Sequence, residues 1–190
     1  MFRKVLVALL LLYKVASVYG AENIAGQSAI LSETNNQSTS QKDLNNLSVY
    51  EYNLKRNAIL KVLSRYDSPL MYSAEAFVDI CSKYELDCYL LPAITGLEST
   101  FGKNIHPGSF NPFGWGGGYI SFRSWNEAIA TVGSGLKNNY IAKGAVSIEQ
   151  IGNIYAASPT WASRIHGFMS EFEEAESVGE LEYSGLEIKL

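Results

Sequence analysis

Glu98 is the residue best suited to acid–base chemistry, in the segment "ITGLESTFG" of residues 94–102. Because an α-helix advances about 100° per residue, Glu98 lies roughly 20° from Leu91 and roughly 40° from Ile94 on a helical wheel. The carboxylate therefore shares the apolar face, which we expect to point to the core or to a cleft floor. Dry surroundings disfavour a charged carboxylate, and a neutral Glu can protonate a leaving oxygen. The alternative is an ordinary helix Glu whose side chain bends out to water.

A glycine-rich and aromatic loop, "NPFGWGGGY", follows this helix. Trp115 and Tyr119 offer flat apolar faces for sugar rings, and the Asn111 amide can bond to ring hydroxyls or an N-acetyl group. The glycines within residues 114–118 let the backbone approach a ligand closely. The alternative for Trp115 is packing in the core. The pattern predicts a sugar-binding groove beside Glu98.

Helices are the elements predicted to position these residues. Two Ser-x-x-Glu/Gln sequences, at Ser124 and Ser147, predict helix starts through capping boxes. The segment Lys103–Phe122 has no helical period and is predicted to form a small β-hairpin or an irregular insertion. The predicted fold class is α+β, mostly α, with this insertion forming the groove. Helical spacing of apolar residues predicts helices over about 47–66, 74–81, 88–101, 124–140, 147–156 and from 158 to beyond 172.

Cys81 and Cys88 are the only cysteines. We place Cys81 in the last turn of one helix and Cys88 at the start of the next. A disulfide between them would link the two helices at the turn that joins them, and export would expose the protein to conditions in which disulfides form. Two buried thiols are the alternative, and the sequence leaves this choice open.

The N-terminal segment is typical of a secretory signal. Arg3 and Lys4 precede the short apolar run Val5–Tyr13, which predicts a signal peptide over residues 1–20. Lys14 is atypical, so an uncleaved membrane tether is the alternative. The predicted protein is therefore exported: secreted, periplasmic or bound to the cell envelope.

Composition shifts predict the remaining boundaries. Residues 21–46 are rich in Ser, Thr, Asn and Gln and predict a flexible polar linker. Residues 47–176 are predicted to form the globular domain, which a hydrophobic share of 47% suits, and 177–190 a loose acidic tail.

The charge and histidine content exclude some partners. The formal charge of −4 and the lack of a basic cluster make the chain a poor nucleic-acid binder. His106 and His166 are too isolated to form a zinc site with the cysteines. We expect no metal, no cofactor and a monomer.

Three segments carry a family resemblance: "ITGLESTFG", "NPFGWG" and "IYAASPTWASRI", in this order. Together they resemble the successive motifs of the bacterial glucosaminidase family (mannosyl-glycoprotein endo-β-N-acetylglucosaminidase-like), within the lysozyme-like superfamily. The resemblance covers about Tyr72 to Phe172. The Glu-Ser motif alone has little specificity, whereas the three together are fairly specific. The resemblance implies a lysozyme-like fold and cleavage of β-1,4 bonds between N-acetylglucosamine and N-acetylmuramic acid in peptidoglycan.

The same resemblance implies roles for individual residues. Glu98 matches the catalytic acid of the family, and Tyr155 matches a tyrosine beside the reacting sugar. The alternative for Tyr155 is core packing. The residues predicted to bind substrate are Ser99, Asn111, Phe113, Gly114, Trp115, Tyr119 and Trp161.

One departure from the family pattern concerns the mechanism. Family members often carry a second acid after the groove motif, but "GWGGGYISFRSW" has none, and the next acid, Glu127, belongs to a capping box. Hydrolysis by two carboxylates is therefore in doubt. With Glu98 alone, the chain could be a glucosaminidase or a lytic transglycosylase that forms a 1,6-anhydro product.

Two other classes of function compete with an enzyme. The missing second acid favours a non-catalytic peptidoglycan-binding module of the envelope. A helical interaction domain held to the membrane by an uncleaved signal is the third hypothesis.

Overall fold

A computed structural model describes residues 48–156 and 158–187, and these residues are mostly helical. The predicted signal peptide and linker lie outside them. The long helices are residues 48–65, α2 (Ala74–Tyr84), α3 (Leu90–Ser99), α4 (Trp125–Gly135), α5 (Ile148–Tyr155) and α6 (Trp161–Glu187). Short turns of helix are η1 (Pro69–Ser73), the π-helical η2 (Leu136–Tyr140) and η3 (Ile141–Lys143).

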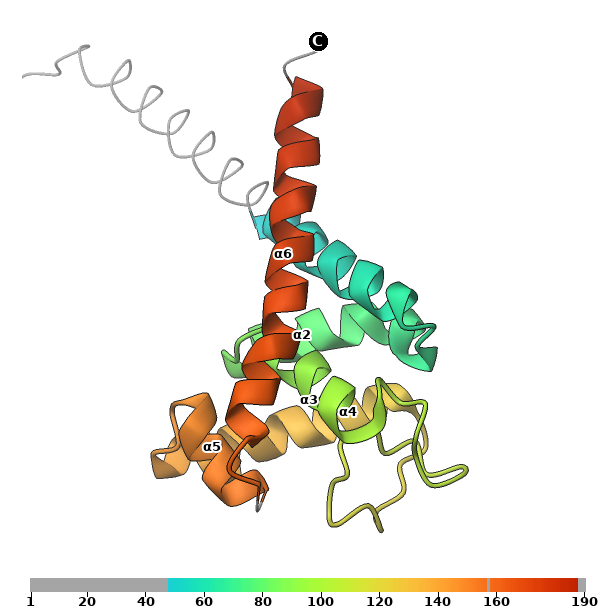
Figure 1. The fold of residues 1–190 in the computed structure, drawn as a ribbon, viewed down its shortest axis with the longest axis vertical. Coiled ribbons are helices and arrows are strands. Elements are labelled where there is room, and N and C mark those ends of the chain that lie inside the picture. Colours follow the sequence, from blue (N-terminus) through green and yellow to red (C-terminus); the bar gives the residue numbers. More distant parts are fainter. Residues whose placement is uncertain (1–47, 157, 188–190) are drawn as a thin grey trace, which may run out of the picture. The chain divides into compact units, whose positions relative to one another are not determined.

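α3 is the central element of the domain. It packs against α6, while α2 packs against α4 (Figure 1). Every residue from Leu90 to Gly96 is buried, which explains why this stretch is apolar on all sides. Pro92 is accommodated because it is the third residue of the helix, where a backbone N–H has no partner within the helix.

The predicted helix starts are largely confirmed. Ser147 and Gln150 form a complete capping box at α5. At α4, Ser124 accepts a bond from the amide of Glu127, but the Glu127 carboxylate reaches back to the amide of Arg123 rather than to that of Ser124. This box is therefore only half formed.

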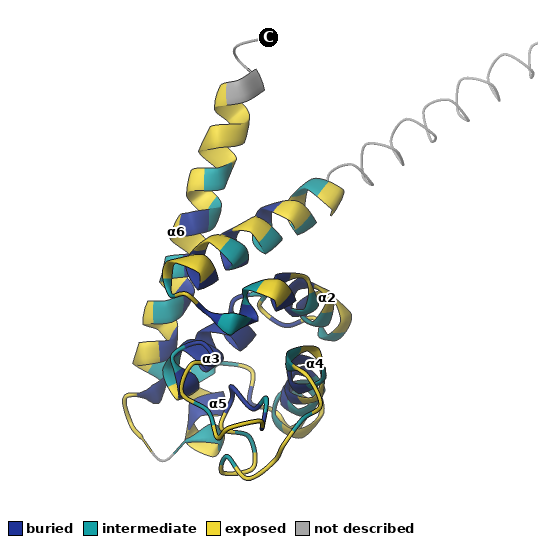
Figure 2. Cartoon of the chain, turned by 90° about the vertical axis from the view of Figure 1, so that its right-hand side faces the viewer, coloured by how far each residue is buried: buried dark blue, intermediate teal, exposed yellow. Residues whose placement is uncertain are grey.

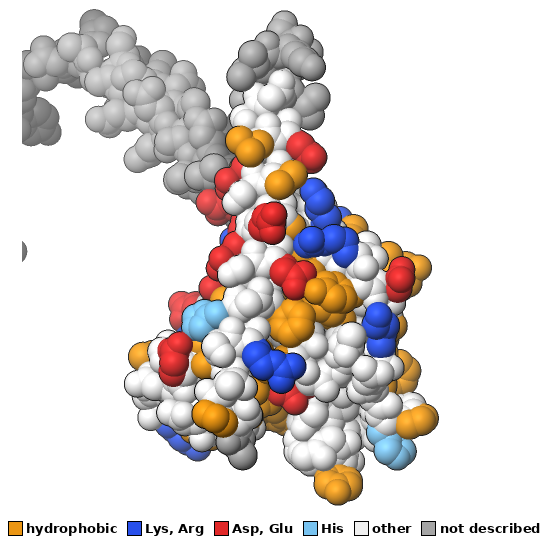
Figure 3. Space-filling model, viewed as in Figure 1, with side chains coloured by type: hydrophobic (Ala, Val, Ile, Leu, Met, Phe, Trp, Pro, Cys, Tyr) orange, Lys and Arg blue, Asp and Glu red, His pale blue; other side chains and the backbone are white. Residues whose placement is uncertain are grey.

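The predicted loose acidic tail is wrong over its described residues. The chain continues as α6 to Glu187, beside the helix of residues 48–65 (Figure 1). Lys55 pairs with Glu176 at 3.0 Å, and the rings of Tyr50 and Tyr183 lie 4.7 Å apart. These contacts join α6 to the helix of residues 48–65, and most of residues 177–185 are exposed (Figure 2). Figure 3 shows acidic side chains distributed along this helix.

The segment between α3 and α4 consists of turns rather than paired strands. No β-strand occurs within residues 48–156 or 158–187, so of the two predicted forms the structure has the irregular insertion. Its glycines explain this: Gly114, Gly116, Gly117 and Gly118 all have positive φ angles, which extended strands do not. One backbone bond, from the Phe122 amide to the Ser109 carbonyl at 2.7 Å, closes the base of the insertion.

Cys81 and Cys88 form a disulfide, with their Cα atoms 4.9 Å apart. The bridge joins the last turn of α2 to the residues just before α3. Glu85 is left-handed between them (φ 53°), so the chain turns sharply enough for the sulfurs to meet.

Reduction of this disulfide is expected to lower the free energy of unfolding by about 2 kcal/mol, because the bridge closes a loop of seven residues. The measurement is urea denaturation with and without a phosphine reductant. The Cys81→Ala/Cys88→Ala variant, which cannot be reduced, is the control and should be indifferent to the reductant. Two thiols that react under denaturing, non-reducing conditions would contradict the bridge.

Within the described part of the chain, no helix is both long and apolar enough to cross a membrane.

Candidate active site

Glu98 lies in the last turn of α3, and its side chain is exposed. The burial expected from the helical wheel is therefore wrong. Leu91 and Ile94, on the same side of the wheel, are buried, whereas this side of the helix reaches the protein surface at Glu98. The carboxylate is nevertheless held: its Oε1 accepts a hydrogen bond from Nε1 of Trp161 at 2.9 Å.

The end of α3 is fixed by three consecutive left-handed residues, Thr100, Phe101 and Gly102. They reverse the chain so that Phe101 returns to the core, where it is fully buried. The hydroxyl of Ser99 accepts a bond from the Gly102 amide at 2.8 Å and lies 2.7 Å from the Pro112 carbonyl, to which it donates. Ser99 is buried, so its observed contacts tie the helix end to the loop.

Asn111 organises the glycine-rich loop from inside. The side chain is 4% exposed, and its Nδ2 donates to the carbonyls of Trp115 and Ile120, both at 2.9 Å. Its Oδ1 accepts from the Trp115 amide at 3.0 Å. One amide therefore satisfies three backbone groups that have no strand partner. Next to it, Phe113 is fully buried and anchors the loop to the core.

Replacing Asn111 with Ala is expected to lower the free energy of unfolding by about 2 kcal/mol, because buried backbone groups lose their partners. Urea denaturation would measure this loss. Asn104→Ala is the matched control: Asn104 donates only an exposed bond to Thr100 and should change stability by less than about 0.5 kcal/mol. Equal stability of the two variants would show that the loop does not depend on Asn111.

Gly114 lies directly against the Glu98 carboxylate. A Cβ placed on Gly114 would be 3.3 Å from Oε2 of Glu98, and the residue has φ +62°. Both the backbone conformation and the close approach therefore require glycine at this position.

A small pocket of about 100 Å³ opens beside Gly114. Trp115 and Tyr140 face it, with ring centroids 6.2 Å apart, and Tyr155 completes the aromatic side at 5.9 Å from Trp115. Gly116 and Gly117 line the rest. The aromatic residues come from three separate elements, the loop, η2 and α5.

Tyr155 is half-buried, and its hydroxyl donates to the Phe113 carbonyl at 2.7 Å. Burial raises the pKa of this hydroxyl well above its usual value, and the charge of Glu98 and the neighbouring Tyr140 raise it further. Tyr155 is therefore a neutral phenol at physiological pH. It ties α5 to the loop, and an oxygen lone pair remains as an acceptor.

Trp161 is buried, with 3% of its surface exposed. Its ring stacks on Tyr155 at 5.2 Å and presents little surface to a ligand. By contrast, Tyr119, in the glycine-rich loop, is 94% exposed. The structure therefore brings together Glu98, Gly114, Trp115, Tyr155 and Trp161, with Ser99, Asn111 and Phe113 as supports beneath them.

Sequence reasoning missed two features of this site. The sequence predicts only that Tyr140 ends the helix over 124–140, whereas in the structure it ends the π-helical turn η2 and lines the pocket. Gly152 was overlooked, although a Cβ there would lie only 2.8 Å from the Trp161 ring. The sequence carries no local signal for a π-helical turn or for this close approach.

Glu127 does not join Glu98 as a second acid. Its carboxylate is occupied by the Arg123 side chain at 2.9 Å, which lowers the pKa of Glu127 through this hydrogen bond. His106 is exposed, and its ring nitrogen contacts only the adjacent Pro107 carbonyl. Among the described residues no group of three or more His, Cys, Asp or Glu could hold a metal ion.

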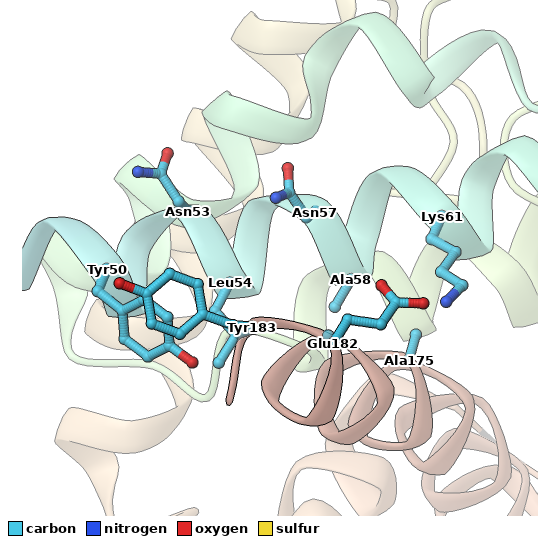
Figure 4. A pocket seen from close by; sticks show the side chains of 10 residues that line it. Tyr50, Asn53, Leu54, Asn57, Ala58, Lys61, Ala175, Glu182 and Tyr183 are labelled. Atoms are coloured by element: carbon cyan, nitrogen blue, oxygen red, sulfur yellow. The ribbon is translucent and has the colours of Figure 1, made fainter. Parts of the chain in front are cut away.

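A larger hollow, of about 290 Å³, lies between the helix of residues 48–65 and the end of α6 (Figure 4). Its walls include Tyr50, Leu54, Lys61 and Tyr183, and none of its lining residues was predicted to act on substrate. Its lining holds one carboxylate, Glu182, but no tryptophan and none of the residues of the glycine-rich loop.

No protein-family model matches this sequence, and no curated protein matches it. Membership of the glucosaminidase family therefore remains a hypothesis that rests on the three sequence motifs.

Proposed function

We propose that the protein is an exported enzyme of lysozyme-like fold that cleaves β-1,4 bonds in peptidoglycan glycan strands, with Glu98 as its single catalytic acid. The observation that carries the proposal is the Glu98 carboxylate, which is held by the Trp161 indole and lies against Gly114, a residue that also lines the aromatic pocket. An ordinary surface Glu has neither a buried donor nor a neighbouring glycine that leaves space for it.

Exposure of Glu98 is compatible with this role. A groove must be open before a polymer enters it, and a bound glycan strand would cover the carboxylate. Exclusion of water by the sugar would favour the neutral, proton-donating form of the acid. The dry surroundings that the sequence predicts for Glu98 would then arise only when a glycan strand is bound.

The proposed reaction uses one carboxyl group in two steps. Glu98 first donates its proton to the glycosidic oxygen, and the bond from that oxygen to the anomeric carbon breaks. The carbonyl oxygen of the substrate's own N-acetyl group bonds to the anomeric carbon and stabilises its positive charge. Glu98, now a carboxylate, removes a proton from an incoming hydroxyl, whose oxygen attacks that carbon and displaces the carbonyl oxygen. Water as the nucleophile gives hydrolysis, and the 6-hydroxyl of N-acetylmuramic acid gives a 1,6-anhydro sugar.

Tyr155 would support the acetamido group. Its hydroxyl proton is committed to the Phe113 carbonyl, so the oxygen can accept a bond from the N–H of that group. Trp115 and Tyr140 would border the same sugar, because they line the same pocket as Tyr155.

Digestion of purified sacculi tests the proposal. The full chain should release soluble muropeptides, and their mass spectra would identify the bond cut from the reducing end and the mechanism from the anhydro mass. Release of nothing would overturn the proposal.

A second candidate is a non-catalytic peptidoglycan-binding module. The specific observation in its favour is that Glu127 is paired with Arg123 and no acid lies in the loop itself. Protein that sediments with sacculi but releases no muropeptides would support this candidate.

A further inference from the structure

The two oxygens of the Glu98 carboxylate have different surroundings. Oε1 accepts the indole N–H of Trp161 at 2.9 Å, whereas Oε2 faces the left-handed Gly114, where a Cβ would lie 3.3 Å away. One oxygen is therefore bound to a buried protein donor, and the other borders the open loop.

The indole cannot easily move away from Oε1. Its ring stacks on Tyr155 with an interplanar angle of 28°, and Gly152 of α5 approaches so closely that a Cβ there would lie 2.8 Å from the ring. Because Trp161 is also buried at the start of α6, the N–H has a fixed position against which the carboxylate aligns.

The chemistry of indole then decides which oxygen carries a proton. The nitrogen of Trp is only a donor and has no lone pair that could accept a hydrogen bond. A proton on Oε1 would make that oxygen a weaker acceptor and would compete with the indole N–H for its lone pairs. The indole bond therefore favours a neutral Glu98 whose proton is on Oε2.

We propose that Trp161 is a positioning residue that assigns separate roles to the two oxygens of Glu98. Oε1 keeps the indole bond in both protonation states, and Oε2 gives its proton to the glycosidic oxygen and takes one back from the nucleophile. This inference rests on the proposed glycan cleavage for its catalytic part, whereas the indole bond can be tested without substrate.

The first test removes only the N–H. The tryptophan analogue 3-benzothienylalanine, placed at position 161, has sulfur in place of N–H and preserves the stacking on Tyr155. We expect kcat for muropeptide release to fall about 10- to 100-fold with KM changed less than about twofold, since the acid loses its alignment but the groove is intact. Trp125→Phe is the control, because Trp125 packs on Phe110 and takes no part in the contacts that join Glu98, Trp161 and Tyr155, so this variant should keep full activity. An active enzyme whose kcat is unchanged by the analogue would overturn the inference.

The second test reads the bond directly in the ¹H–¹⁵N spectrum of the indole groups. The Trp161 N–H should be shifted downfield and protected from solvent exchange across the acidic range in which carboxylates titrate. Glu98→Gln should retain this signal, because the Gln carbonyl can accept the same bond, whereas Glu98→Ala should lose it. Loss of protection as the pH falls, or a signal unaffected by Glu98→Ala, would overturn the inference even in a protein that proved inactive on sacculi.

Discussion

Replacement of Glu98 by Gln is expected to reduce the release of muropeptides from sacculi by about 10³-fold or more, because one carboxyl group serves as both acid and base. Gln has the same shape and can still accept the Trp161 N–H, but it has no proton to give to the glycosidic oxygen. The measurement is the initial rate of release, followed by mass spectrometry of the products. Circular dichroism and thermal denaturation should be close to those of the wild type, since the side chain is exposed.

Glu127→Gln is the matched control for this change. Glu127 is the next acid along the chain, and it pairs with Arg123 at a helix start. Its replacement should leave the rate of release within about twofold of the wild type and the stability little changed, because an exposed ion pair contributes little. If Glu127→Gln were the inactive variant, or if Glu98→Gln retained activity, the assignment of the catalytic acid would be wrong.

Replacement of Gly114 by Ala is expected to lower the rate of release by about 10- to 100-fold, because the new methyl group pushes on the reacting oxygen of Glu98. The Cβ would lie 3.3 Å from Oε2, so the carboxylate must shift by a few tenths of an ångström. The left-handed φ of +62° adds a separate cost of about 1–2 kcal/mol in stability. The measurements are the rate of release and the free energy of unfolding, determined on the same preparation.

Gly118→Ala separates the effect of contact with Glu98 from the effect of the left-handed backbone. Gly118 is also left-handed, with φ +81°, but a Cβ there would have no heavy atom within 4 Å. This control should lose similar stability and keep most of its activity. Equal activity losses in both variants would mean that distortion of the loop, rather than contact with Glu98, is responsible.

Much of the helical framework could be predicted because its signals are local. Apolar spacing and capping residues located α2, α4 and α5 to within a few residues, and the Ser147–Gln150 box formed in full. The length of α6 could not be read in this way. Its last turns have few apolar residues, and they contact a helix more than a hundred residues earlier, as in the Tyr50–Tyr183 pair.

The features of the candidate site likewise divide into those set by neighbouring residues and those set by contacts between distant segments. The sequence by itself determined that an acid ends a buried helix and that a glycine- and tryptophan-rich loop follows it, because both features lie within neighbouring residues. The exposure of Glu98, the place of Tyr140 in the pocket and the burial of Trp161 with its N–H on the carboxylate follow instead from how distant segments pack. Glu98 and Trp161 are 63 residues apart, and a bond over that separation depends on how α3, α5 and α6 pack rather than on any local pattern.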